Sequence, residues 1–370
     1  MRKLFLMILL FAALSSPAAG GSEALTVAAK GAVLIDGASG RVLFGQKENE
    51  MLPEASCTKI MTALLALEHS ELDEEVTAGK NAHGVTGTSI YLSEGETLTM
   101  EQMLYGLMLR SGNDAAVAIA EHVAGSVSAF ADLANARAAE LSADAHFVNP
   151  HGLDADGHAA SALGLARIMR EAMKNTDFRT ITATERKIIP WVGNEYSRVL
   201  ENKNRLLSTY EGATGGKTGY TSKAGRCLVF SAERDGLELI GCVLNCYTWF
   251  DTAEVMLDYG FEHFRMERAL ERGQAAAQIT VLDGARANVD AIVTEPLAAA
   301  VEIGAKVSVE VDSKPLVAPV EKGQEVGTVR LMCNGKTVAS LPLTAATAVE
   351  AWSLSAAIRN VLRSWALQFS

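Results

Sequence analysis

Two hairpin-like patterns, one at each end of a region with helical spacing, limit the fold more than any other feature. Residues 32–35 are apolar, residues 41–44 are apolar after Arg41, and the two runs flank an Asp-Gly-Ala-Ser-Gly turn. Residues 226–233 and 237–245 are also largely apolar, and they flank an Arg-Asp-Gly turn. Hairpins form antiparallel strand pairs, and the helical patterns fall between them along the chain. The sequence therefore predicts an α+β fold in which helices cover an antiparallel sheet.

Apolar residues at helical spacing occupy much of the chain between the two hairpins. One helical stretch begins near Ser56 and continues through Met61 and Leu64. Two further helices are expected over residues 100–109 and 114–123. The short Arg-Ser-Gly-Asn segment between these two helices is expected to be a loop.

The chain changes character after about residue 262. Its 370 residues are too many for one ordinary domain. Short β-type runs then cover residues 278–282, 289–293, 306–311, 328–332 and 337–341, and an Asn-Gly turn joins the last two. We expect one mixed domain over residues 21–262, followed by a small β-sandwich domain over residues 263–348.

The first 20 residues have the three parts of a secretory signal peptide. Arg2 and Lys3 provide a positively charged start, residues 4–14 are apolar, and residues 15–20 are mostly small, as a cleavage site requires. The apolar part is short for a stable membrane span. We expect export with removal of residues 1–20, and an uncleaved N-terminal anchor is the alternative.

Residues 349–370 are expected to form one terminal helix. Within residues 351–370 the apolar side chains of one face are Leu354, Ile358, Val361, Leu362, Trp365 and Phe369. This stretch has two arginines and no acid, although the whole chain has a formal charge of −11. That composition favours an interfacial helix on an anionic membrane surface, and a helix docked on the protein itself is the alternative. The acidic charge of the whole chain argues against a nucleic-acid partner.

The five cysteines are scattered along the chain. They form neither a Cys-x-x-Cys pair nor a Cys/His cluster with metal-ligand spacing, so the sequence predicts no metal site. Buried free thiols are the expected state, and one disulfide remains possible in an exported protein.

Three short motifs follow one another in the mixed domain, and the first is Ser56-Cys57-Thr58-Lys59. Residues three apart on a helix share a face, so Ser56 and Lys59 are expected side by side. Burial would lower the pKa of Lys59, and a neutral amine can accept the serine proton. By itself a Ser-x-x-Lys pattern is expected roughly once by chance in a chain of this size. A solvated helical lysine is therefore the alternative.

The second motif is Ser111-Gly112-Asn113, in the loop between the two predicted helices. A loop can present both polar side chains to a cleft. Ser111 can relay a proton to a leaving amine, and Asn113 can hold Lys59 and a substrate amide. A helix N-cap before Asp114 explains the same triplet without any chemistry.

The third motif is Lys217-Thr218-Gly219, in a glycine-rich run. Glycine lets a backbone approach a ligand closely, and a strand edge can pair with an extended peptide. Lys217 can supply a cation for the terminal carboxylate of a peptide, and Thr218 a hydrogen bond. The spacing excludes a phosphate loop, because Glu211 occupies the position where that motif needs glycine.

In this order the three motifs resemble those of the low-molecular-weight penicillin-binding proteins, the serine D-alanyl-D-alanine carboxypeptidases of peptidase family S11. The flanking segments 55–62, 110–115, 149–153, 216–221 and 257–261 also resemble the extended patterns of this family. The resemblance covers nearly the whole mature chain. It implies a β-lactamase/transpeptidase-like domain with an antiparallel sheet and helices, followed by a β-rich domain and an amphipathic helix.

The resemblance also implies a reaction and a set of site residues. The catalytic residues are Ser56, Lys59, Ser111 and Asn113, and the substrate-binding residues are Lys217, Thr218, Gly219 and Tyr220. Ser56 would attack the peptidoglycan stem peptide ending in D-Ala-D-Ala, and water would hydrolyse the resulting acyl-enzyme. The backbone N–H groups of Ser56 and Tyr220 would form the oxyanion hole. β-Lactam antibiotics would acylate the same serine, and neither a metal nor a cofactor is required.

Alternative functions share this acyl-serine site. A β-lactamase is disfavoured, because the chain lacks the Glu-x-x-Leu-Asn segment of class A enzymes: its one Leu-Asn pair, Leu244-Asn245, has Gly241 at the glutamate position. A D,D-endopeptidase remains open, since one site can cut either bond. A catalytically silent wall-binding protein would have no need of intact Ser56, Lys59 and Lys217. The expected location is the outer face of the bacterial cytoplasmic membrane.

Overall fold

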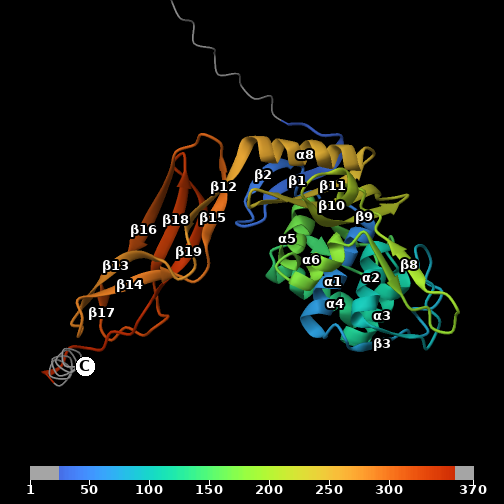
Figure 1. Cartoon of the computed structure of the whole chain (residues 1–370), viewed down its shortest axis with the longest axis horizontal. Coiled ribbons are helices and arrows are strands. Elements are labelled where there is room, and N and C mark those ends of the chain that lie inside the picture. The colour runs from blue at the N-terminus through green and yellow to red at the C-terminus, as the bar shows by residue number, and fades with distance from the viewer. Residues whose placement is uncertain (1–24, 355–370) are drawn as a thin grey trace, which may run out of the picture.

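The computed structural model describes residues 25–354. Figure 1 shows two lobes, a mixed domain and an all-β domain, which meet after a long helix, α8 (Trp249–His263). The predicted export signal at residues 1–20 lies outside the described residues, as do residues 355–370 of the predicted terminal helix.

A five-stranded antiparallel sheet forms the centre of the mixed domain, in the order β2-β1-β11-β10-β9. Its strands are β1 (Ala29–Asp36), β2 (Val42–Gln46), β9 (Ala213–Thr221), β10 (Gly225–Arg234) and β11 (Leu237–Cys246). Both predicted hairpins are confirmed, and the two hairpins are joined where β1 of the first pairs with β11 of the second. This order leaves β9 at one edge of the sheet.

Alternating side chains explain why helices cover both faces of this sheet. In β1, Ala32 and Leu34 pack in the apolar cluster that contains Met256 and Leu257 of α8. The intervening Val33 packs in the larger cluster beneath the opposite face. Figure 1 accordingly shows α8 on one side of the sheet and α1 to α6 on the other.

The helices on that other side carry the first two motifs. They are α1 (Lys59–His69), α2 (Met100–Leu109), α3 (Asn113–Ala124), α4 (Val127–Glu140), α5 (Ala162–Ala172) and α6 (Thr176–Ala183), with a 3₁₀ turn, η1 (Ala55–Thr58), before α1. The short α7 (Leu206–Thr209) lies on the α8 side, because Leu206 packs in the same cluster as Met256. Small two-stranded sheets join β3 (Glu75–Thr77) to β4 (Thr97–Thr99), β5 (Ala145–His146) to β6 (Ala159–Ala160), and β7 (Arg186–Ile189) to β8 (Arg198–Glu201). The helices predicted over 100–109 and 114–123 are confirmed to within a residue.

The second domain is built from strands alone within the described residues. Six strands form one sheet in the order β16-β18-β19-β14-β13-β17, and two more, β12 and β15, pair separately. Their bounds are β12 (Phe264–Leu270), β13 (Ala275–Leu282), β14 (Asn288–Val293), β15 (Leu297–Glu302), β16 (Val307–Ser313), β17 (Leu316–Val317), β18 (Glu325–Cys333) and β19 (Lys336–Ala345). Apolar residues of both layers share one core, as the β-sandwich prediction requires.

The chain after β19 differs from the predicted terminal helix at its start. Val349 and Ala351 form β-bridges with Val320 and Gly284, so the first residues of the segment 349–370 are extended. Their backbone groups pair with the β-domain, which competes successfully with helix formation. Among residues 25–354 no single helix is long and apolar enough to cross a membrane, and α3 with α4 meets that criterion only as a pair bent by 81°.

The two domains are joined through the turn between β1 and β2. Asp36 is fully buried, and its carboxylate accepts a hydrogen bond of 2.9 Å from the backbone N–H of Ala300 in β15. Arg41 donates to the carbonyl oxygen of Ala300 at 2.7 Å and pairs with Glu302 at 3.3 Å. These contacts fix the β-domain against the sheet of the mixed domain.

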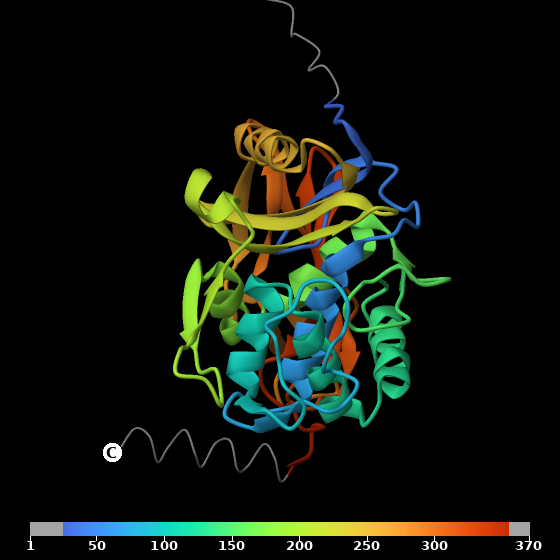
Figure 2. The same cartoon turned by 90° about the vertical axis from the view of Figure 1, so that its right-hand side faces the viewer.

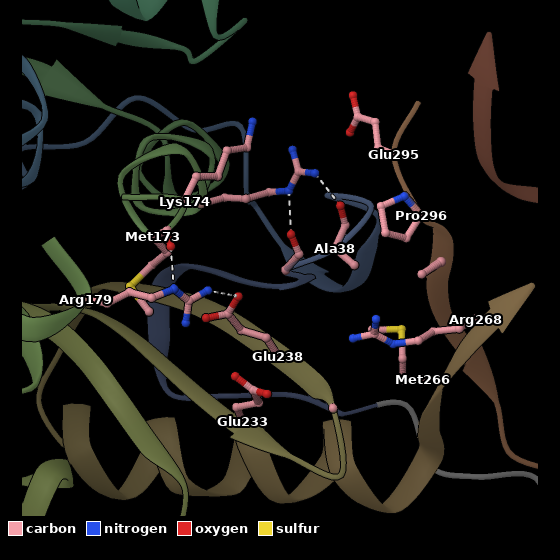
Figure 3. Close-up of a pocket in the computed structure, with 14 residues that line it drawn as sticks. Ala38, Met173, Lys174, Arg179, Glu233, Glu238, Met266, Arg268, Glu295 and Pro296 are labelled. Atoms are coloured by element: carbon pink, nitrogen blue, oxygen red, sulfur yellow. Dashed lines mark hydrogen bonds and ion pairs between the residues drawn. The ribbon is translucent and has the colours of Figure 1, made fainter. Parts of the chain in front are cut away.

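A polar hollow of about 510 Å³ lies beside this junction. Figure 3 shows that residues of both domains line it, among them Arg179 and Glu238 from the mixed domain and Arg268 from β12. Arg170 donates to the carbonyl oxygens of Gly37 and Ala38, which holds the β1–β2 turn in place.

Candidate active site

The first motif lies at the start of α1. Ser56 is in the 3₁₀ turn η1, and Lys59 is the first residue of the α-helix. The Lys59 amine is 2.9 Å from the Ser56 hydroxyl oxygen, so the two side chains share one side of the turn as the sequence predicts. Ser56 is half-buried, whereas Lys59 has no exposed surface. A solvated lysine is therefore excluded.

Lys59 is held by three oxygen atoms. Besides Ser56, its amine contacts the side-chain oxygen of Asn113 at 2.8 Å and the carbonyl oxygen of His151 at 2.6 Å. Burial lowers the pKa of Lys59 well below its ordinary range, and the charges of Lys217 and Lys203 lower the pKa further. The lowered pKa favours the neutral amine, which is the state that accepts a proton from a hydroxyl.

The second motif lies where α2 gives way to α3. Ser111 has a positive φ of 63°, and Gly112 is the N-cap residue of α3 without any side-chain capping bond. The N-cap explanation of this triplet is therefore wrong. Asn113 instead accepts from Lys59 and donates to the carbonyl oxygen of Thr86 at 2.6 Å.

The third motif lies on the edge strand β9. Lys217 is buried, and burial lowers its pKa to about 7. A Cβ atom at Gly219 would be 2.7 Å from the carbonyl oxygen of Glu54 and 3.0 Å from the backbone nitrogen of Ser56. Only glycine lets the strand approach the serine turn this closely. The backbone of β9 at Gly219 thereby lies directly against the serine turn.

These motifs meet in one cleft of about 450 Å³ between the edge strand and the helices. Figure 2 looks onto this side of the mixed domain, with the yellow strands of the sheet above the blue and cyan helices. Six of the eight predicted site residues line the cleft, namely Ser56, Ser111, Asn113, Thr218, Gly219 and Tyr220. Lys59 and Lys217 are buried rather than part of its lining.

The chemistry available in the cleft comes from hydroxyl, amine and amide groups. None of its described lining residues is acidic, and Lys203 adds a further cation. Among residues 25–354 no group of three or more His, Cys, Asp or Glu side chains is placed to hold a metal ion. All five cysteines are buried free thiols, and burial raises the pKa of Cys57 beside the serine.

A buried polar network supports the serine turn from behind. Glu54 and His158 are both buried, and their side chains meet at 2.8 Å. The Nδ1 atom of His158 accepts from the backbone N–H of Val148, so its Nε2 carries the proton and donates to Glu54. The Thr58 hydroxyl contacts both side chains at 2.9 Å. The network thus ties the residue before the turn to the residue that ends it.

Sequence reasoning did not find several residues that complete the site. The segment 149–153 was noted only for its family-like sequence, yet its His151 carbonyl holds Lys59. Asp114 accepts from the backbone N–H groups of Ile90 and Leu92, and so fixes a loop near the cleft. The one available signal in the sequence for Asp114 was an acidic residue directly after a motif. A backbone carbonyl leaves no signal in a sequence.

Comparisons with known sequence families agree with this arrangement. Residues 18–248 match the peptidase S11 family, described as D-alanyl-D-alanine carboxypeptidase. Residues 264–351 match the C-terminal domain of penicillin-binding protein 5.

Individual relatives are similar over most of their length. D-alanyl-D-alanine carboxypeptidase DacF of Bacillus subtilis is 33% identical over 350 residues, which cover 91% of this chain and 90% of that protein. DacA of Escherichia coli K12, a protein with the same enzyme name, is 33% identical over 84% of this chain and 81% of its own. The crystal structure of penicillin-binding protein 5 from Haemophilus influenzae superposes with a TM-score of 0.79 at 28% identity, covering 89% of this chain and all of that one.

Proposed function

Since the chain belongs to the peptidase S11 family of D-alanyl-D-alanine carboxypeptidases, we propose that Ser56 is the nucleophile with which it removes the terminal D-alanine of peptidoglycan stems. The chain is a serine-type hydrolase of the penicillin-binding class and acts on peptidoglycan, outside the cytoplasm. One observation carries the assignment to Ser56: its hydroxyl is 2.9 Å from the buried amine of Lys59.

Acylation begins when Lys59, as the neutral amine, takes the hydroxyl proton of Ser56. The serine oxygen then forms a bond to the carbonyl carbon of the penultimate D-alanine. The carbonyl oxygen becomes negative, and the backbone N–H groups of Ser56 and Tyr220 stabilise it. The close approach of the serine turn to Gly219, the residue before Tyr220, supports this role.

The leaving amine needs a proton before the amide bond breaks. Lys59 holds the proton taken from Ser56, and the Ser111 hydroxyl in the cleft relays it to the departing nitrogen. Terminal D-alanine leaves, and the rest of the stem remains as an ester on Ser56. Water then attacks this ester with Lys59 again accepting a proton, which restores the serine. Asn113 keeps the Lys59 amine in place through both steps.

The third motif binds the terminal carboxylate of the substrate. In its protonated form Lys217 supplies the positive charge, and the Thr218 hydroxyl supplies a hydrogen bond. The ligand-free pKa of Lys217 is about 7. A bound carboxylate favours the protonated amine, so binding of substrate raises that pKa.

The alternatives have less support. A β-lactamase needs a group that activates water for rapid deacylation, and none of the described residues that line the cleft is acidic. This favours a long-lived penicilloyl ester. A silent wall-binding protein would not need two buried lysines, because burial of an amine lowers the stability of the fold. Endopeptidase action remains a second activity of the same site.

Domain roles and membrane association complete the proposal. We assign residues 21–262 to catalysis, residues 263–348 to the β-domain and residues 1–20 to an export signal. The amphipathic segment 351–370 would hold the enzyme at the outer face of the cytoplasmic membrane. Its two arginines and its apolar face support this location.

The decisive experiment is mass spectrometry of the mature protein after incubation with penicillin. We expect a penicilloyl adduct on a Ser56 peptide and no adduct on the Ser56→Ala protein. D-Alanine release from a pentapeptide, with no cleavage of a cross-linked dimer, would then identify carboxypeptidase activity. A well-folded wild-type protein that neither forms the adduct nor releases D-alanine would refute the proposal.

A further inference from the structure

The active-site cleft continues into a second hollow around the edge of β9. This hollow has a volume of about 470 Å³, within the usual range for small-ligand sites of roughly 300–1,000 Å³. Its lining residues are Tyr220, Gly225, Arg226, Asn245, Tyr247 and Trp249. Tyr220 and Trp249 also line the cleft that holds Ser56, so the two spaces adjoin each other.

Strand pairing places the charged and aromatic side chains together. Arg226 of β10 is the register partner of Tyr220 of β9, so their side chains stand on the same face of the sheet. That face is the one covered by α8, and Trp249 is the first residue of this helix. Tyr247 lies in the turn between β11 and α8. The hollow is thus formed by β9, β10, β11 and α8, together with the turn that joins the last two.

Exposed aromatic side chains that gather in one hollow point to a binding site. Tyr247 is 79% exposed and Tyr220 is 64% exposed. The Arg226 guanidinium lies 4.7 Å from the centre of the Tyr247 ring and 5.9 Å from that of the Trp249 ring. The aromatic faces suit an aliphatic chain, as the side chain of a diamino acid provides.

Arg226 gives the hollow its charge. The side chain is exposed and donates one hydrogen bond, of 2.8 Å, to the carbonyl oxygen of Tyr247. Among residues 25–354 no carboxylate lies within ion-pair distance of Arg226. A guanidinium has five N–H donors, so its remaining donors are available for the two oxygens of a carboxylate.

We propose that this hollow binds a carboxylate-bearing, aliphatic segment of the peptidoglycan peptide beyond the D-Ala-D-Ala dipeptide. The inference rests on the proposed function, in which Lys217 and Thr218 take the terminal carboxylate and the N–H of Tyr220 takes the scissile carbonyl. A group that reaches Arg226 from there lies outside the dipeptide. Such carboxylates occur in the remainder of the same stem and in a second, cross-linked stem. The hollow makes the enzyme prefer wall fragments to short D-Ala-D-Ala peptides.

The test compares Arg226→Gln and Tyr247→Ala with the wild type on three substrates. These are a diacetylated L-Lys-D-Ala-D-Ala tripeptide, a complete pentapeptide stem and a cross-linked stem dimer. The control is Arg234→Gln, because Arg234 is on the same strand and also stacks on two rings, those of Tyr210 and Phe261, outside the described lining of either space. Penicillin acylation is measured on every variant, since it reports the acyl-serine function alone.

We expect Arg226→Gln to lower kcat/KM for the complete stem by about tenfold through KM, because one charged hydrogen-bonded contact is lost. Tripeptide turnover and penicillin acylation should stay within about twofold, and Arg234→Gln should change nothing. A loss confined to the cross-linked dimer assigns the carboxylate to the second stem instead of the first. Equal losses on all substrates, or no loss on either large one, overturn the proposal. If penicillin does not acylate the wild type, the proposed function is refuted, but the hollow is still testable. Stem binding to Ser56→Ala is then compared with stem binding to the double variant Ser56→Ala with Arg226→Gln, and equal affinities overturn the proposal.

Discussion

A Cβ atom at Gly152 would lie 1.9 Å from the carbonyl oxygen of Ala55, the residue before Ser56, the proposed nucleophile. Gly152 also has a φ of 86°, which side chains other than glycine rarely adopt. The neighbouring His151 carbonyl holds the Lys59 amine. Gly152 therefore lets its loop, whose His151 carbonyl oxygen accepts a hydrogen bond from Lys59, pack directly against the serine turn.

Substitution of Gly152 by alanine should reduce the rate of acylation by disturbing the serine turn. The added methyl group must displace the serine turn, and a misplacement of about 1 Å can reduce a rate about 100-fold. We expect penicillin acylation by Gly152→Ala to fall by that order. Gly157→Ala is the matched control, because Gly157 has a φ of 81° but its Cβ would come no closer than 3.6 Å to the His146 ring. Similar losses of acylation in both variants would show that backbone strain, not the clash, is responsible.

Lys59 should give acylation a characteristic dependence on pH. Burial and two nearby cations hold its pKa well below the ordinary lysine range. The acylation rate should therefore rise with pH through that lowered pKa and level off below pH 10. Lys59→Arg keeps its proton at every such pH, so we expect a loss of about 10²- to 10⁴-fold without the rise. Stopped-flow acylation from pH 5 to 11 tests this, and a rate that is still climbing at pH 10 would contradict it.

Lys217 should appear in the pH dependence of stability. Its folded-state pKa is about 7, below the ordinary lysine pKa of 10.5, so the unfolded state binds more protons between these two values. The free energy of unfolding should rise with pH across that window. In Lys217→Met this contribution is absent, and the slope should be smaller by up to one proton. Urea denaturation at pH 7 and pH 9 measures the difference. An equal change in the free energy of unfolding between pH 7 and pH 9 in the two proteins would mean that Lys217 keeps an ordinary pKa.

Much of this architecture was predictable from residue patterns. The hairpins and the α2–α3 pair were found because their apolar periodicity and turn residues are local. The three motifs were found because each one is contiguous in sequence. Lys59 and Ser56 were placed side by side from helical spacing alone, and the distance of 2.9 Å agrees.

Other features depend on contacts between distant segments. The strand β15 contains three successive alanines, and β12 contains two arginines, so neither has a typical strand composition. Pairing with each other and packing on the larger sheet override these weak preferences. The Glu54–His158 contact joins residues 104 positions apart in the chain, and no local pattern indicates it.

The buried pair of Arg198 and Glu96 allows a test of stability away from the reacting atoms. Two guanidinium nitrogens lie 2.6 and 2.8 Å from the two carboxylate oxygens, and both side chains are nearly inaccessible. Burial alone would raise the pKa of Glu96, but hydrogen bonds from Arg198 and from the Ser93 N–H outweigh it and leave the pKa lowered. The pair therefore contributes stability above the ordinary carboxyl pKa, and this contribution is lost as the pH falls through the lowered value.

Removal of Arg198 alone should be costly, because it leaves Glu96 buried without a partner. We expect Arg198→Met to lower the free energy of unfolding at pH 7 by about 3–5 kcal/mol. The double variant Arg198→Met with Glu96→Gln should recover part of this loss, since no buried charge remains. Lys30→Met is the control, because Lys30 and Glu50 form an exposed pair, and such a pair contributes about 1 kcal/mol or less. Chemical denaturation of all four proteins at pH 7 gives the values. A double variant that is less stable than Arg198→Met would show that the bonds of Glu96 to the Ser93 loop outweigh its pairing with Arg198.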